Sequence, residues 1–75
     1  MIAEIVIERS EASNVSDEDL KLVQSYKEYI NELLYCDYID TDGVDEQPSR
    51  RIKIESKIYK MGAPSIIIVL GDYVE

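Results

Sequence analysis

The sequence contains no histidine, no tryptophan and no phenylalanine, and it has only one cysteine among its 75 residues. Without histidine the chain lacks the side chain that most often exchanges protons near neutral pH, and no spacing pairs its cysteine or serines with another base. We therefore expect no enzymatic activity and no catalytic residue. Cys36 alone excludes an internal disulfide and leaves no Cys/His spacing for zinc, which fits either a reducing cytoplasm or a fold that is indifferent to redox conditions.

Glycines and long apolar runs are also scarce. The glycines at positions 43, 62 and 71 are isolated and form no phosphate-binding loop, so we expect no nucleotide and no other cofactor. The longest apolar run, 66–70, is far too short to span a bilayer, and Glu4 interrupts the place where the apolar core of a secretion signal would lie. These features predict a cytoplasmic protein.

Positive charge is scarce in the first two thirds of the chain. Residues 1–49 carry thirteen Asp and Glu against three Lys and Arg, whereas residues 50–75 carry three against five, for a net charge of -8. Such a surface repels phosphate and attracts basic proteins. We therefore expect a basic protein as the partner and no direct contact with nucleic acid.

Hydrophobic periodicity predicts three strands. Residues 2–8 and 50–61 alternate between apolar and polar side chains, which is typical of half-buried strands. Residues 65–74 are apolar on both faces through their middle, which favours a central strand. The short turn at 62–64 predicts that the second and third strands form an antiparallel hairpin.

One helix is expected between the first two strands. Ser16 precedes three consecutive carboxylates, and a capping hydroxyl followed by acidic residues matches the exposed amides and the positive dipole at a helix start. An apolar stripe with helical spacing continues to about Tyr35. Residues 37–49, which are rich in Asp with Gly and Pro, predict a solvated loop.

These elements predict a single α+β domain over residues 1–75, with the order β-α-β-β. The expected sheet is three-stranded and antiparallel, in the order 1-3-2, with the helix on one face. One helix covers only one face, and so small a core is commonly supplemented by oligomerisation, so we expect a homodimer. The residues expected in the dimer interface are Ile2, Val6, Tyr59, Ile67 and Val69.

The sequence also contains partial signals for a calcium site and for a nucleic-acid contact. Asp40, Asp42 and Gly43 match the middle of a calcium-binding EF-hand loop, but the pattern then puts Tyr38 and Ser49 at ligand positions that require carboxylates. We therefore expect no metal site. The basic residues of 50–60 suggest a nucleic-acid contact, but the net charge favours a solvated strand face or cross-strand pairing instead.

The carboxylates have two interpretations: a solubilising face, or a surface that replaces DNA phosphates for a basic partner. Their concentration on the helix and the following loop favours the second interpretation, and Tyr38 adds amphipathic contact area. The residues expected to bind the partner are Glu18, Glu28, Glu32, Asp37, Tyr38, Asp40, Asp42, Asp45 and Glu46.

In size, charge and domain plan the chain resembles the small acidic virus-encoded DNA-mimic proteins, which include a phage inhibitor of the bacterial histone-like protein HU. The resemblance involves no sequence motif. It implies a non-enzymatic inhibitor that occupies the basic DNA-binding surface of a host protein, in the host cytoplasm. The alternatives are an anti-CRISPR or anti-restriction inhibitor, and an acidic dimeric structural or adaptor protein that acts through its apolar sheet face.

Overall fold

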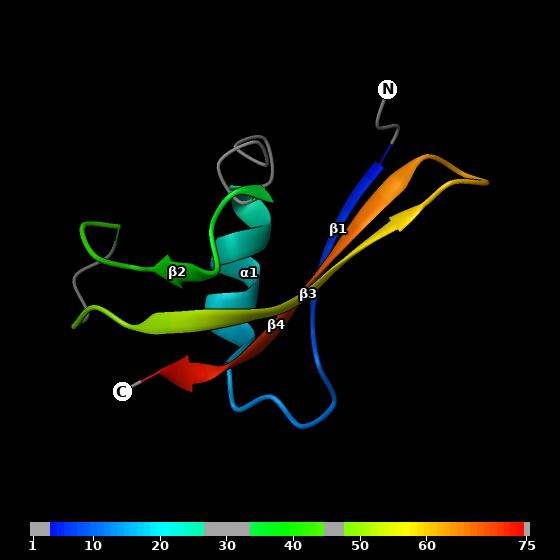
Figure 1. The fold of residues 1–75 in the computed structure, drawn as a ribbon. Helices are drawn as coiled ribbons and strands as arrows, with labels where there is room; N and C mark the ends of the chain where they lie inside the picture. The colour runs from blue at the N-terminus through cyan, green and yellow to red at the C-terminus, as the bar shows by residue number, and fades with distance from the viewer. Residues whose placement is uncertain (1–3, 27–33, 45–47, 75) are drawn as a thin grey trace.

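The computed structural model describes residues 4–26, 34–44 and 48–74. The elements in chain order are β1 (Glu4–Arg9), α1 (Asp17–Ser25), β2 (Tyr38–Asp40), β3 (Arg51–Lys60) and β4 (Ser65–Val74). The strands form one curled sheet in the order β1-β4-β3-β2, and α1 lies against one face of it (Figure 1). The predicted α+β class is confirmed.

The sheet is mixed rather than antiparallel. β1 is parallel to β4, whereas β3 is antiparallel to both β4 and β2. The prediction correctly placed the last strand between the first strand and its own hairpin partner, but its three antiparallel strands are wrong. The missed element is β2, which lies in the segment predicted as a loop. This short strand adds one reversal of chain direction before β3, so β4 runs parallel to β1.

Helix α1 begins where the sequence predicts. The Ser16 side chain accepts a hydrogen bond from the backbone N–H of Asp19 at 3.1 Å, which satisfies one of the free amides of the first turn. α1 ends at Ser25, with Tyr26 at its C-cap, so the single helix predicted to continue to about Tyr35 is interrupted there, although Leu34 is again helical. Residues 27–33 lie outside the described part of the chain. Among the described residues, no helix is long and apolar enough to cross a membrane.

The core lies between α1 and one face of the sheet. Ile68 and Leu70 of β4 and Ile52 of β3 are completely buried, which explains why the strand that is apolar on both sides lies at the sheet centre. Val23 of α1 and Val15 of the preceding loop close the core from the helix side. Hydrogen bonds of Ser16 and Asp19 with Tyr73 hold the helix start near the carboxyl end of β4.

The alternation of β3 changes phase along the strand. Ile54 is paired with Leu70 on the core face, but register shifts on both sides of Ile54 leave Ile58 paired with Ile67 on the other face. Directly paired residues share a face of the sheet. The uniform alternation predicted for 50–61, which put Ile58 beside Ile52, is therefore wrong beyond Ile54, because a β-bulge adds a residue to the strand.

Candidate protein-binding surface

A partly buried ion pair joins the start of α1 to the start of β3. Asp19 is only 5% exposed, and the Arg50 guanidinium donates to both of its carboxylate oxygens, from Nε to Oδ2 at 2.7 Å and from Nη2 to Oδ1 at 2.9 Å. Arg50 Nη1 also donates to the carbonyl of Pro48 at 2.8 Å. This bidentate geometry is the strongest form of Arg–carboxylate contact and fixes both side chains.

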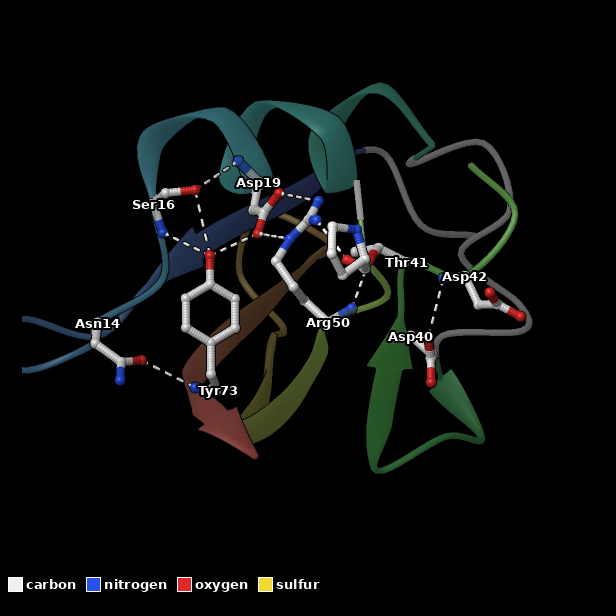
Figure 2. Close-up of polar contacts among 9 residues, drawn as sticks. Asn14, Ser16, Asp19, Asp40, Thr41, Asp42, Arg50 and Tyr73 are labelled. Carbon is white, nitrogen blue, oxygen red and sulfur yellow. Dashed lines mark hydrogen bonds and ion pairs between the residues drawn. The ribbon is translucent and has the colours of Figure 1, made fainter. Parts of the chain in front are cut away.

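Tyr73 ties the same carboxylate to the end of β4. Its hydroxyl donates to Asp19 Oδ2 at 2.5 Å and accepts from the backbone N–H of Ser16 at 3.1 Å. The backbone N–H of Tyr73 donates to the Asn14 side chain at 2.9 Å. Figure 2 shows the Tyr73 hydroxyl and the Arg50 guanidinium converging on the Asp19 carboxylate from β4 and from the residue before β3. The helix N-terminus is therefore held by side-chain contacts as well as by its apolar face.

The Arg50 guanidinium holds the pKa of Asp19 below the ordinary value of 3.8. Its hydrogen bonds are the largest influence, burial opposes them by raising the pKa, and the Tyr73 hydroxyl lowers it further. A carboxyl whose pKa is lower in the folded state stabilises the fold above its unfolded pKa, and this stabilisation is lost as the pH falls through the folded pKa. The ion pair is therefore intact at neutral pH.

Arg50 also holds the acidic turn that follows β2. Its backbone N–H donates to Thr41 Oγ1 at 2.8 Å, and its carbonyl accepts from the backbone N–H of Thr41 at 2.9 Å. Thr41 is only 2% exposed. One residue thus connects the first turn of α1, through Asp19, with the turn at residues 41–44. We call these three residues, Asp19, Thr41 and Arg50, the Arg50 clamp.

The turn itself has a defined backbone. Asp40 Oδ1 accepts from the backbone N–H of Asp42 at 2.9 Å, and the backbone N–H of Val44 donates to the carbonyl of Thr41 at 3.1 Å. Gly43 has a φ of 79°, which side-chain-bearing residues rarely adopt. In Figure 2 the carboxylates of Asp40 and Asp42 lie on the outer side of this turn, away from the buried Asp19.

The structure places five of the predicted partner-binding residues on its surface, and the other four, Glu28, Glu32, Asp45 and Glu46, lie outside the described residues. One of the five is already paired within the chain, because Asp40 lies 3.3 Å from Arg51, and Tyr38 is 49% exposed. The five exposed residues are Glu18, Asp37, Tyr38, Asp40 and Asp42, and we call this set the acidic surface.

The arginines of the described segments are bound by carboxylates of the same chain. Arg9 pairs with Asp17, Arg50 with Asp19, and Arg51 with Asp40. The basic stripe that the sequence suggested therefore loses Arg51 to β2 and Arg50 to the helix. The neighbouring Lys57 donates to the carbonyl of Leu34 at 2.9 Å. These contacts leave less positive charge available for phosphate than the sequence count suggests.

An apolar groove borders the acidic surface between α1 and β2. It has a volume of about 180 Å³. Its rim includes Tyr26 and Val44, which are 45% and 42% exposed. Further lining comes from Leu22 and Ile39, which are half-buried, and from Asp40 of the acidic surface. Carboxylates and exposed apolar side chains therefore lie next to each other, as they do at many protein interfaces. In the described segments, no cluster of three or more metal-ligating side chains occurs.

The residues predicted for the dimer interface differ in how exposed they are. Val6, Ile67 and Val69 are half-buried, Tyr59 is 55% exposed, and Ile2 lies outside the described residues. Tyr59 is paired with Ile66, whereas Ile58 is paired with Ile67. The phase change in β3 therefore brings Ile58, which the prediction omitted, to the side of Val6 and Ile67.

The sequence interpretation missed the Arg50 clamp. It took Asp19 as one of three carboxylates at a helix start, and Arg50 as part of a solvated basic stripe. A signal was present, because Asp19 stands four residues before Val23 and seven before Tyr26, on the side of α1 that carries the apolar stripe. A carboxylate on such a face requires a cation or hydrogen-bond donors beside it. The identity of that cation was not readable from spacing, since Arg50 lies 31 residues away.

No protein-family model matches the chain, and the searches of curated proteins and of solved structures returned no significant match either.

Proposed function

We propose that this chain is a non-enzymatic DNA mimic, which binds the basic DNA-binding surface of a nucleic-acid-binding protein through the acidic surface. The class of partner we propose is a histone-like nucleoid protein. The observation that carries the proposal is the Arg50 clamp, because it holds the acidic turn against the helix start while leaving the outer carboxylates exposed.

A rigid array of charges suits this function for an energetic reason. Binding that must first order a flexible acidic loop loses affinity to conformational entropy, whereas a turn that is already hydrogen-bonded does not. Asp37 and Asp42 are exposed at the two ends of the segment that contains β2. The backbone carbonyl of Asp37 accepts from Ile54 at 2.8 Å, so both ends of the segment are held by hydrogen bonds.

The charge balance of the described residues supports a basic partner over nucleic acid. Arg9, Arg50 and Arg51 are each paired with a carboxylate of the chain, one of which is Asp40 of the acidic surface, so the unpaired charges of the described surface are mostly negative. The net charge of -8 then acts at long range to steer a basic protein toward the chain. Tyr38 and the apolar groove, which its neighbour Ile39 lines, would supply the contacts that distinguish one basic partner from another.

The salt dependence of capture from a bacterial lysate tests this proposal. We expect the immobilised chain to recover DNA-binding proteins at low salt and to lose them as the ionic strength rises, because the contacts are between exposed charges. Salt-resistant recovery of a partner that is not basic would contradict mimicry. That outcome would favour an adaptor acting through the apolar sheet face.

An anti-CRISPR or anti-restriction inhibitor would use the same acidic surface against a different basic groove. An adaptor would bind its partner through a different surface, the open face of the sheet, which carries the half-buried residues Ile67 and Val69. Recovery of a nuclease in the salt-labile fraction, in place of a histone-like protein, would change the proposed target while leaving the mechanism as it stands.

A further inference from the structure

The face of the sheet opposite α1 carries a row of aliphatic side chains across three strands. Val6 of β1, Ile67 of β4 and Ile58 of β3 are register partners, so their side chains lie side by side on one face. Val6 and Ile67 are half-buried, and Ile58 is 45% exposed. In Figure 1 the part of the β3–β4 hairpin that joins β1 extends past the helix. None of these three residues belongs to the described core cluster that packs against α1.

Charges of opposite sign flank the row at equal heights. Two residues along the strands from this row, the central strand carries Ser65. Its register partners are Glu4 of β1 and Lys60 of β3. They stand two strand spacings apart, about 10 Å, which is too far for them to pair with each other. Both are exposed, and neither makes an ion pair with another described residue. The face is therefore acidic at one side, apolar in the middle and basic at the other side.

We propose that this face binds a second copy of the chain, about a two-fold axis that runs along β4. Rotation about such an axis exchanges the two sides of the face and preserves height along the strands. Glu4 of one copy then lies over Lys60 of the other, twice per dimer. Ile67 meets Ile67 at the axis, and Val6 meets Ile58. A single face thereby complements itself in both charge and shape, which is the requirement for a closed two-fold interface.

The geometry agrees with known packing of sheets. Two β-sheets pack about 10 Å apart with their strands roughly aligned, and side chains of the inner faces interdigitate between them. Aliphatic residues at the centre with charges at the edge reproduce the apolar core and polar rim of a protein interface. A different protein as the occupant would have no reason to match the height at which Glu4 and Lys60 stand.

Sedimentation equilibrium of the full chain tests for the dimer at concentrations up to about 1 mM. We expect the wild type to form dimers and Ile58→Glu to be monomeric, because that substitution places two carboxylates in the apolar row. Val44→Glu is the matched control, since Val44 is 42% exposed and belongs to the groove beside β2. It should dimerise as the wild type does. A monomeric wild type, or equal association of both variants, would overturn the proposal.

Charge exchange tests the axis. Glu4→Lys and Lys60→Glu should each weaken association about tenfold, because two attractive contacts per dimer become repulsive, and the double variant should restore it. A general effect of net charge predicts the opposite result for Glu4→Lys, which makes the chain less acidic. Stronger association of Glu4→Lys, or a double variant no better than the single ones, would show that the copies do not meet in this arrangement.

Discussion

Replacement of Asp19 by alanine is expected to lower the free energy of unfolding by about 3 kcal/mol, because removal of the buried carboxylate leaves the partly buried charge of Arg50 without its partner. Arg50 would lose two hydrogen bonds, and the hydroxyl of Tyr73 would lose the nearer of its two acceptors, keeping only Ser16 Oγ at 3.2 Å. A chain of this length has a total stability of roughly 4–11 kcal/mol. Urea unfolding followed by circular dichroism measures the change.

Asp17→Ala is the matched control, two residues earlier in the same helix turn. The Asp17 side chain is 75% exposed and pairs with Arg9 at the surface, so its loss should cost less than about 1 kcal/mol. Equal losses for the two variants would mean that the Arg50 clamp contributes little to stability.

The Asp19→Asn variant tests the charge itself. The free-energy difference between it and the wild type should be constant above the ordinary pKa of 3.8 and should shrink as the pH falls through the lowered pKa of Asp19. If the free-energy difference between the two proteins is unchanged at the lowest pH, the negative charge of Asp19 is not the cause of the stabilisation.

Reversal of charge at Asp37 and Asp42 to lysine is expected to weaken inhibition of DNA binding at least about 100-fold, because attraction to basic side chains becomes repulsion at two positions. The fold should remain intact, because Asp37 and Asp42 make their hydrogen bonds to other residues through backbone groups and not through their carboxylates. A gel-shift competition between the chain and duplex DNA for HU gives the inhibitory concentration.

Glu11→Lys combined with Glu55→Lys provides the control for net charge. Both residues are exposed and lie outside the acidic surface, and the double variant raises the net charge from -8 by the same four units. It should inhibit within a few-fold of the wild type. If the two double variants lose inhibition equally, total charge rather than the acidic surface carries the activity.

Local sequence signals correctly predicted the helix start and the central strand, each of which depends on one local physical cause. Ser16 and the carboxylates after it marked the helix start, and the apolar run in 65–74 identified the central strand, because capping and burial are local in the chain. The prediction for residues 38–40 was wrong, because their strand depends on pairing with β3, whereas their own composition favours a turn. That one missed strand also reversed the predicted direction of β4 relative to β1.

The candidate surface was predictable in charge but not in geometry. The composition of 37–49 identified an exposed acidic segment, and Asp37, Tyr38, Asp40 and Asp42 are indeed exposed. The Arg50 clamp depends on contacts between residues far apart in the chain, which periodicity does not encode. The bulge in β3 had a similar consequence, because one extra residue moved Ile58 to the opposite face.

Displacement of the labelled chain from purified HU by unlabelled duplex DNA tests the central claim most directly. If the acidic surface occupies the DNA-binding surface, fluorescence anisotropy should fall to the value of the free chain as duplex is added, and the apparent Kd should rise in proportion to the DNA concentration. A complex in which HU holds the chain and the duplex together, with an unchanged Kd for the chain, would contradict DNA mimicry.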